Sequence, residues 1–476
     1  MRIDSEHNRK KINRVRRKIN QGRVINQDIR RVFVFFALIF LALILFAGYF
    51  LLFQSSAVIN NSYNRRSDAL NKTVQRGSIL ADDGTVLAYS VINDDGSEAR
   101  IYPFSNAFAH VVGYSSNGRS GLESAYNYYL LTSHAGIFQK ISNEFRNIKN
   151  PGDSIQTTLK AGLQNYIYNL LGDQNAAVIC MNPDTGEVYA MVSKPDFDPN
   201  VIAQIWDSLV QEEDAEDSLG ASESSSVLLN RVTQGLYTPG STFKIFTLYE
   251  YYLEHQKQVD GFSFDCAGTL LVGDTSISCY SGAHGHENLM QAFYNSCNCA
   301  FGTIGMGLDL EHFIQTTNSL LFGTKLPIDL SSSESRFSIS KSDSDFDIMA
   351  TAFGQGNTQV TPLHLAMVVS AIANEGICMK PYLVKYVLNP SGEITKQFRS
   401  ERYAQLFPEE DASFLKEYLR SVVTDGTAGA VYPGNFVAYG KTGTAQESKF
   451  RSNHSNFIGY SPYYEPEDRK STRLNS

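Results

Sequence analysis

The chain has 476 residues, which is too long for one average domain and long enough for two domains with a large core. Its composition, 42% hydrophobic and 19% charged, is that of a folded protein and excludes a largely disordered one. The formal net charge of −8 argues against nucleic acid as a partner, because nucleic-acid binding needs a basic surface and only the N-terminus is strongly basic.

The N-terminus combines a basic stretch with an apolar one. Residues 1–31 are rich in lysine and arginine, and the uncharged run VFVFFALIFLALILFAGYFLLF follows from Val32 to Phe53. A transmembrane helix needs about 20 apolar residues, and a secretory signal has a shorter apolar core. We therefore expect a cytoplasmic tail over 1–31, a membrane-spanning helix over 32–53 and an extracellular remainder from about Gln54, since positive charge stays inside.

The region after the span predicts two modules. Residues 54–155 are polar, and Arg76–Ser90 is typical of two short strands joined by an Asp-Gly turn, so a small β-rich pedestal or dimerisation-type module is expected there. Residues 156–468 have stronger signals and are expected to form the main domain. Ala176–Ser193 within it predicts two strands joined by a turn.

The main domain mixes helices and strands. Residues 211–226 are acidic and serine-rich, which predicts an exposed loop. A helix from Ser241 is apolar around its whole circumference and should be buried. Further helices are predicted over 289–306, 310–321 and 364–376, and a strand over 436–446. This order of strand pairs, helices and strands indicates an α+β fold.

Two cysteines flank a predicted hairpin. Cys266 and Cys279 enclose strands with a turn at Gly273-Asp274, and in an oxidising compartment they could form a disulfide worth at most about 3 kcal/mol. The alternative is a zinc site formed by Cys279, His284 and His286. The sequence has no fourth ligand at a usual spacing, which argues against this site. The other cysteines are interpreted as small buried residues: Cys180, Cys297, Cys299 and Cys378.

The stretch YTPGSTFK places a serine and a lysine three residues apart, Ser241 and Lys244. Residues three apart share one helix face, so the amine can reach the hydroxyl. A buried lysine loses ammonium stability and can act as a base, which makes Ser241 a candidate nucleophile. The alternative role for Ser241 is a helix N-cap. The same Ser-x-x-Lys spacing occurs at Ser338 and Lys341, so the pattern alone is weak evidence for a nucleophile.

Two later motifs strengthen the first. Ser296-Cys-Asn298 follows at a predicted helix junction, although Ser62–Asn64 and Ser115–Asn117 have the same pattern. Lys441-Thr-Gly443 is the only Lys-Ser/Thr-Gly sequence in the chain and lies on a predicted strand. The alternative interpretation of Lys441 is a solvent-exposed lysine at the edge of a sheet. Together and in this order, the three motifs form the active-site set of penicillin-binding proteins and serine β-lactamases.

Other stretches extend the likeness, namely Gly121-Leu-Glu123, Asn230-Arg231 and AFGQGNTQVTPLHLA from Ala352 to Ala366. The chain resembles a class B penicillin-binding protein, a monofunctional peptidoglycan D,D-transpeptidase of the short-pedestal Gram-positive type. The resemblance implies an antiparallel sheet flanked by helices, no metal or organic cofactor, and a single-pass location in the plasma membrane. It implies as partners peptidoglycan stem peptides, β-lactams and a separate membrane glycan polymerase.

The resemblance also implies a role for each motif residue. The catalytic set comprises the nucleophile, the base, the proton relay, a group that binds the peptide amide and a positive field: Ser241, Lys244, Ser296, Asn298 and Lys441. The substrate-binding residues are Thr442, Gly443 and Thr444, of which the two threonine hydroxyls would hold the substrate carboxylate. The backbone N–H groups of Ser241 and Thr444 would form the oxyanion hole.

The C-terminus departs from the family pattern. Asn456–Pro466 could supply one more strand, but residues 469–476 are polar and are expected to be a non-native tail on a truncated transpeptidase domain. Three rival functions follow from the same motifs: a membrane-anchored β-lactamase, a β-lactam sensor and a catalytically silent cell-wall scaffold. A lactamase needs a device that directs water, and a sensor needs a larger cytoplasmic effector than 1–31.

Overall fold

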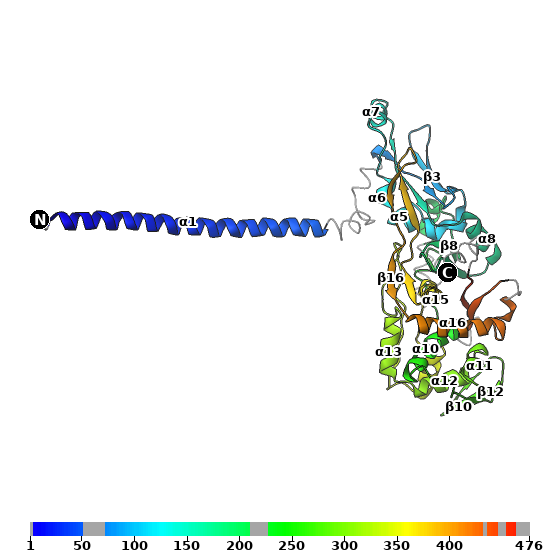
Figure 1. Cartoon of the computed structure of the whole chain (residues 1–476). Coiled ribbons are helices and arrows are strands. Elements are labelled where there is room, and N and C mark those ends of the chain that lie inside the picture. Colours follow the sequence, from blue (N-terminus) through cyan, green and yellow to red (C-terminus); the bar gives the residue numbers. More distant parts are fainter. Residues whose placement is uncertain (1–2, 51–71, 210–226, 432–435, 446–453, 463–476) are drawn as a thin grey trace, which may run out of the picture. The chain divides into compact units, whose positions relative to one another are not determined.

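The structure is a computed structural model that describes the chain except residues 1–2, 51–71, 210–226, 432–435, 446–453 and 463–476 (Figure 1). The chain divides into two compact units, residues 1–64 and 65–476. The acidic loop predicted over 211–226 and the tail 469–476 lie outside the described residues, so both stay predictions.

Within its described residues, the first unit forms one long helix, α1, Ile3–Tyr49. Its segment Ile29–Tyr49 has a mean hydropathy of 2.8, and its apolar side chains are not buried within the protein. By length and composition this segment could cross a membrane, which agrees with the predicted anchor. The end of the predicted span, residues 51–53, lies outside the described residues.

The pedestal is built around a six-stranded sheet, ordered β15-β14-β6-β2-β3-β4. Its first strands are β2 (Ile79–Leu80), β3 (Val86–Ile92), β4 (Glu98–Ile101) and β6 (Ser154–Thr157). The predicted Asp-Gly turn is confirmed: Gly84 has a φ of +85°, and its N–H donates to the Ala81 carbonyl at 3.1 Å. The paired strands β1 (Val74–Gln75) and β5 (Asn150–Pro151) lie outside this sheet.

Two features of the pedestal were not predicted. The sheet also takes in β14 (Val384–Leu388) and β15 (Ile394–Gln397), which come from far along the chain. Short helices interrupt the expected β-rich module: η2 (Ser105–Phe108), α4 (Ala109–Val112), α5 (Gly121–Ala125), α6 (Asn127–Leu130) and α7 (Ile137–Phe145).

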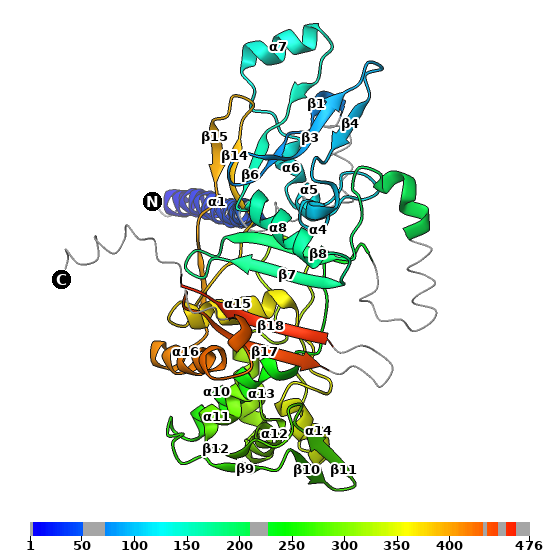
Figure 2. The same ribbon diagram turned by 90° about the vertical axis from the view of Figure 1, so that its right-hand side faces the viewer.

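The main domain contains two separate antiparallel ladders. One joins β7 (Ala176–Met181) to β8 (Val188–Lys194), which confirms the predicted strand pair. The other joins β17 (Tyr439–Ala445) to β18 (His454–Tyr460). Figure 2 shows the ladders one above the other, and α15 (Pro362–Ala373) contacts both β7 and β18. Two more helices support them: α8 (Ala161–Leu171) contacts β8, and α16 (Glu409–Thr424) contacts β17.

Below the ladders lies a helical region. The helix predicted from Ser241 begins as the 3₁₀ turn η3 (Gly240–Phe243) and continues as α10 (Lys244–Glu254). Its predicted core residues are all buried: Phe243, Ile245, Phe246, Leu248, Tyr249 and Tyr252. The segment predicted as helical over 289–306 is broken, and the region also contains α11 (Leu289–Tyr294), α12 (Asn298–Gly307), α13 (Leu310–Ser319) and α14 (Asp345–Ala352).

Short ribbons complete the α+β fold. β9 (Phe264–Cys266) pairs with β12 (Gly285–Glu287), and β10 (Thr269–Val272) pairs with β11 (Thr275–Ser278). The predicted Gly273-Asp274 turn joins β10 to β11, with Gly273 at a φ of +57°. β13 (Ile377–Met379) pairs with β16 (Arg402–Gln405). The ribbons β9 to β12 lie at the opposite end of the second unit from the six-stranded sheet (Figure 2).

Candidate active site

The serine of the first motif sits in the tight turn before a buried helix. Ser241 lies in η3, and Lys244 is the first residue of α10. No side chain caps either element, so the N-cap interpretation of Ser241 is wrong. Instead, the Lys244 amine (Nζ) donates to Ser241 Oγ at 3.1 Å. The turn therefore serves to place a hydroxyl beside an amine.

Glycines allow three backbone segments to meet at this turn. Gly240 has a φ of +55°, and its N–H donates to the Gly354 carbonyl at 2.9 Å. A Cβ on Gly354 would lie 2.0 Å from the Gly240 carbonyl oxygen, and one on Gly240 would lie 2.6 Å from the Thr444 carbonyl oxygen. A Cβ on Gly443 would lie 2.9 Å from the Pro239 carbonyl oxygen. Only glycine permits this close approach of β17 to the turn.

The second motif lies where α11 gives way to α12. Ser296 has a φ of +58°, which breaks the helix that the sequence predicted as continuous. The Lys244 amine donates to the Ser296 carbonyl at 2.6 Å and to Asn298 Oδ1 at 2.8 Å, and it lies 3.2 Å from Ser296 Oγ. The Asn298 side chain in turn donates to the Ser278 carbonyl at 3.0 Å. The break thus turns both polar side chains toward the buried lysine.

The third motif completes the cluster from the strand side. Lys441 is fully buried on β17, and its amine donates to Ser296 Oγ at 3.0 Å and to the Thr442 carbonyl at 3.0 Å. The Ser296 hydroxyl therefore lies between two lysine amines. Burial lowers the pKa of Lys244 to about 7 despite nearby cysteines and Glu287. Burial, and then the charge of Lys244, hold the pKa of Lys441 well below its ordinary value.

Two polar residues of the site were missed by the sequence reasoning. Thr427 Oγ1 lies 2.7 Å from Thr442 Oγ1, so a second hydroxyl reaches the strand residue expected to hold a carboxylate. Asn456, on β18, donates from its side chain to the carbonyls of Thr238 and Pro239 at 3.1 Å each. Neither residue belongs to a recognisable motif, and long-range folding alone brings them to the site.

The other Ser-x-x-Lys and Ser-x-Asn sequences of the described chain do not form comparable clusters. Ser338 and Lys341 are exposed, and the Lys341 amine pairs with Glu311 at 3.1 Å on the surface. Ser115 is half-buried and Asn117 is exposed on a loop, while Ser62–Asn64 lies outside the described residues. The structure therefore selects one of the two Ser-x-x-Lys motifs by burial and contacts.

The geometry supports nucleophilic acyl chemistry. A partly exposed serine hydroxyl contacts a buried amine whose pKa is near neutrality, which is how a weak nucleophile is activated. A second hydroxyl, Ser296, links that amine to a second buried one. Thr444 is exposed on β17 beside the turn, where a substrate could reach it.

Comparisons with known proteins agree with this assignment. The family described as "Penicillin binding protein transpeptidase domain" matches residues 176–467, and "Penicillin binding protein A dimerisation domain" matches residues 76–155. The peptidoglycan D,D-transpeptidase PbpA of Mycolicibacterium smegmatis is 28% identical over 459 residues, covering 93% of this chain and 92% of the relative.

Solved structures give the same result. The D,D-transpeptidase domain of a peptidoglycan glycosyltransferase from Eggerthella lenta is 31% identical, with a TM-score of 0.70, covering 82% of this chain and 91% of that one. The imipenem acyl-enzyme of penicillin-binding protein A from M. tuberculosis is 26% identical, with a TM-score of 0.70 and coverages of 83% and 92%. The transpeptidase match spans more than half of the chain, which therefore belongs to the class B penicillin-binding proteins, with a dimerisation domain and a transpeptidase domain.

Proposed function

We propose that the chain is a serine D,D-transpeptidase that cross-links peptidoglycan stem peptides through an acyl-serine intermediate and is acylated there by β-lactams. The observation that carries the proposal is the continuous contact from Ser241 through Lys244 and Ser296 to Lys441. The acyl-enzyme structures of the M. tuberculosis relative with imipenem and penicillin G support it.

The first half-reaction would form a serine ester. Ser241 Oγ bonds to the carbonyl carbon of the penultimate D-alanine, and its proton passes to the neutral Lys244 amine, 3.1 Å away. When the carbon–nitrogen bond breaks, that proton passes through the Ser296 hydroxyl to the nitrogen of the leaving D-alanine. Lys244 ends the step neutral, and no oxidant, metal or further reactant is needed.

The remaining residues would bind and orient the substrate. Asn298 lies beside the proton relay and can bind the peptide's backbone amide through its side chain. The Thr442 and Thr444 hydroxyls would hold the terminal carboxylate, with Gly443 allowing the strand to approach the turn. Lys441 would supply positive charge when protonated. The N–H groups of Ser241 and Thr444 would stabilise the oxyanion.

The second half-reaction distinguishes a transpeptidase from its rivals. An amine of a neighbouring stem peptide attacks the ester and releases Ser241, whereas a β-lactamase would use water. A gel assay of the full chain with fluorescent penicillin, followed by a chase with unlabelled penicillin, tests this. We expect a stoichiometric adduct that persists through the chase. Rapid loss of label would identify a β-lactamase, and absence of label a catalytically silent scaffold.

A persistent adduct fits a β-lactam sensor as well, so cross-linking itself must be measured. Full chain supplied with uncross-linked glycan strands should yield cross-linked stem peptides, detected by mass spectrometry after digestion of the glycan. Penicillin should abolish the product. Stable penicillin adduct without any cross-linked product would favour the sensor.

We further propose that α1 anchors the chain with residues 1–31 in the cytoplasm and the transpeptidase domain outside. The basic residues before the apolar segment support this orientation. A class B protein makes no glycan itself, so a separate membrane polymerase is the proposed partner of the 32–53 helix and the 54–155 pedestal. Cross-linking from cysteines placed along Val32–Tyr49 should capture it, and failure to capture any membrane protein in cells would count against it.

We also propose that the transpeptidase sheet is incomplete in the described part of the chain. The β7–β8 and β17–β18 ladders are not joined by any described strand, and every residue of β7 is only half-buried. Apolar strand residues that stay partly exposed contribute less to stability than fully buried ones. We expect the 65–476 unit to melt early or broadly in calorimetry. One sharp transition at the temperatures usual for mesophile domains would contradict the proposal.

A further inference from the structure

The helix α7 (Ile137–Phe145) carries an apolar face that is exposed to solvent. Four bulky side chains follow one another at the spacing i, i+1, i+4 and i+8, which places them on one side of a helix. Their exposed fractions are 69% for Ile137, 86% for Phe138, 46% for Ile141 and 89% for Phe145. No residue of α7 is buried, so the described part of the chain leaves this face uncovered.

The polar side of α7 is the one held by the pedestal. The Lys140 amine donates to the Ser133 carbonyl at 2.8 Å, and the Asn143 side chain donates to Asn150 Oδ1 at 3.1 Å. A helix at the surface of a water-soluble domain packs its apolar face inward and shows its polar face to water. The orientation of α7 is the reverse, which indicates that its apolar face meets a non-aqueous surface.

Both ends of the segment that carries α7 lie beside β1, the first described strand after α1. The Gly152 N–H donates to the Gln75 carbonyl of β1 at 2.8 Å, and the Asp153 N–H donates to the Thr132 carbonyl at 2.7 Å. β5, which follows α7, pairs in parallel with β1. Figure 2 shows α7 at the end of the second unit opposite the β9 to β12 ribbons. In the proposed topology, the end with α7 is the one joined to the membrane-spanning helix.

The charges around α7 suit a lipid surface. Residues 136–150 contain three basic side chains, Lys140, Arg146 and Lys149, and one acidic side chain, Glu144. An apolar helix face with basic flanks is typical of helices that lie in the plane of a membrane interface, where anionic headgroups attract the basic groups. The bulky side chains would then reach the boundary between headgroups and acyl chains.

We propose that α7 lies in the outer interface of the membrane that α1 crosses, with Ile137, Phe138, Ile141 and Phe145 inserted among the lipids. This placement rests on the proposed anchor and goes beyond the proposed function. One short helix binds a bilayer weakly by itself, because stable attachment takes two signals. The tether to α1 supplies the second by keeping α7 at a high effective concentration near the surface. Residues 65–476 alone should therefore stay in water.

A second attachment point would orient the active site. β14 and β15 pair into the pedestal sheet, so pedestal and transpeptidase domain belong to one unit. A pedestal held by both its tether and α7 tilts less than one held by a tether alone. The Ser241 hydroxyl would thus be kept within a narrow range of distances from the bilayer.

A second copy of the chain is the competing occupant of the apolar face, because residues 76–155 match a family described as a dimerisation domain. A two-fold contact through α7 would bring the same patch of two chains together. The basic flanks of the two helices would then lie close to each other and repel. The charges and the position of α7 at the anchored end favour the membrane.

Fluorescence from a probe on α7 tests the proposal. The full chain is reconstituted at one copy per lipid nanodisc, in phosphatidylcholine and phosphatidylglycerol, with a nitrobenzoxadiazole fluorophore on Phe138→Cys. We expect blue-shifted emission and strong quenching by nitroxide-bearing lipids. Gln139→Cys is the matched control, because Gln139 is the exposed neighbour on the polar side, and its probe should show water-like emission with little quenching.

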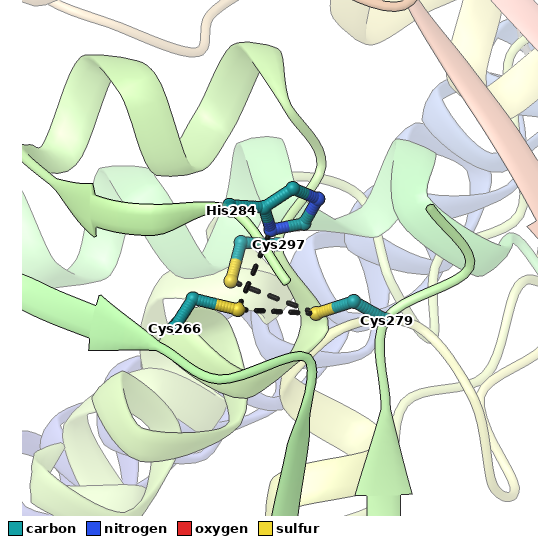
Figure 3. Close-up of side chains that lie close together, drawn as sticks. All are labelled: Cys266, Cys279, His284 and Cys297. Atoms are coloured by element: carbon teal, nitrogen blue, oxygen red, sulfur yellow. Dashed lines mark hydrogen bonds between the residues drawn. The ribbon is translucent and has the colours of Figure 1, made fainter. Parts of the chain in front are cut away.

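The native cysteines leave this labelling selective. Five of the six are buried, namely Cys266, Cys279, Cys297, Cys299 and Cys378. Figure 3 shows three of them, with His284, gathered in one internal cluster. The sulfurs of Cys266 and Cys279 lie 3.8 Å apart, and their disulfide stays a prediction that would leave no thiol there to label. Cys180 is half-buried, so wild-type chain treated with the fluorophore gives the background.

Variants of the apolar face complete the test. Ile137→Ser with Phe145→Ser, introduced into the Phe138→Cys chain, should lower lipid quenching several-fold. Penicillin labelling in detergent should keep the wild-type rate, which shows that the domain remains folded. Ser241→Ala should give wild-type quenching, which separates this proposal from the proposed function. Equal quenching at positions 138 and 139, or none at 138, would overturn the proposal. A blue shift that needs two chains per disc and occurs without lipid quenching would assign the face to a second copy instead.

Discussion

One hydroxyl between two buried amines is the central feature of the site at the scale of single residues. Ser296 Oγ lies 3.2 Å from the Lys244 amine and 3.0 Å from the Lys441 amine. Two buried ammonium groups this close would repel each other, so at least one amine is favoured in its neutral form. A neutral lysine can accept a proton, which is the role proposed for Lys244.

Lys244 predicts a pH dependence of acylation. Its pKa of about 7 means that the neutral amine gains population as the pH rises through neutrality. We expect the rate of penicillin labelling to rise about tenfold per pH unit below that value and to level off above it. Single-turnover labelling across this range measures the profile. The other ionisable groups near Lys244 are Lys441, Glu287 and the cysteines 279, 297 and 299.

The same shift affects stability with a defined sign. The folded pKa of Lys244 lies below the unfolded value of about 10.4, so the unfolded chain binds more protons between these two values. Its contribution to stability therefore rises with pH across that window.

A labelling rate that is flat or falls as the pH rises through neutrality would contradict Lys244 as the base.

Residue-level chemistry was largely predictable from the sequence because the three motifs carry reactive groups at fixed local spacings. The structure brings Ser241, Lys244, Ser296, Asn298 and Lys441 together as the motifs indicated. Thr427 and Asn456 were not found. Their partners lie 15 or more residues away in the sequence, so no local pattern marks them.

At the scale of elements, the site depends on backbone segments that touch without side chains between them. Gly240, Gly354 and Gly443 let η3, the loop after α14 and β17 pack at distances that a Cβ would prevent. These contacts set the position of Ser241 relative to β17. Propensity could locate the turn from Pro239-Gly240, but the left-handed break at Ser296 depends on tertiary contacts and was not predicted.

Gly240→Ala tests this packing. The change forces alanine into a left-handed conformation, at about 1–2 kcal/mol, and pushes β17 away from the turn, because the Cβ would lie 2.6 Å from the Thr444 carbonyl. We expect penicillin labelling to slow by about a hundredfold, the effect of a displacement near 1 Å.

Gly323→Ala is the matched control. Gly323 has a similar φ of +63°, but a Cβ there meets no atom within 4 Å. The stability of Gly323→Ala, measured by thermal unfolding, should fall by a similar amount because the backbone strain is similar. Its rate of penicillin labelling should stay near that of the wild type. Equal labelling in both variants would show that the close approach at Gly240 is not needed.

At the scale of the whole molecule, the chain separates into a unit with the N-terminal apolar helix and one compact catalytic unit. All residues proposed for catalysis lie within 65–476, and β14 and β15 pair into the pedestal sheet, which joins pedestal and transpeptidase domain in one unit. Sequence order gave no sign of this shared sheet, because pairing of β14 with β6 joins residues that are more than 200 positions apart. The N-terminal apolar helix, in contrast, was predictable from local composition.

Removal of the anchor tests this division. A chain of residues 65–476, exported by a cleavable signal, should partition into water and be labelled by penicillin at the rate of the full chain. The full chain should remain in the membrane fraction. Partition of both versions with membranes, or loss of labelling without α1, would contradict the independence of the two units.

The central claim, that Ser241 is the acylated nucleophile, is tested most directly by locating the penicillin adduct in the full chain by peptide mass spectrometry. The account predicts one adduct, on Ser241, and its absence in Ser241→Ala, which should unfold at nearly the wild-type temperature because Ser241 caps no helix. Ser338→Ala, in the exposed second Ser-x-x-Lys sequence, should be labelled like the wild type. A stoichiometric adduct on another residue, or undiminished labelling of Ser241→Ala, would contradict the account.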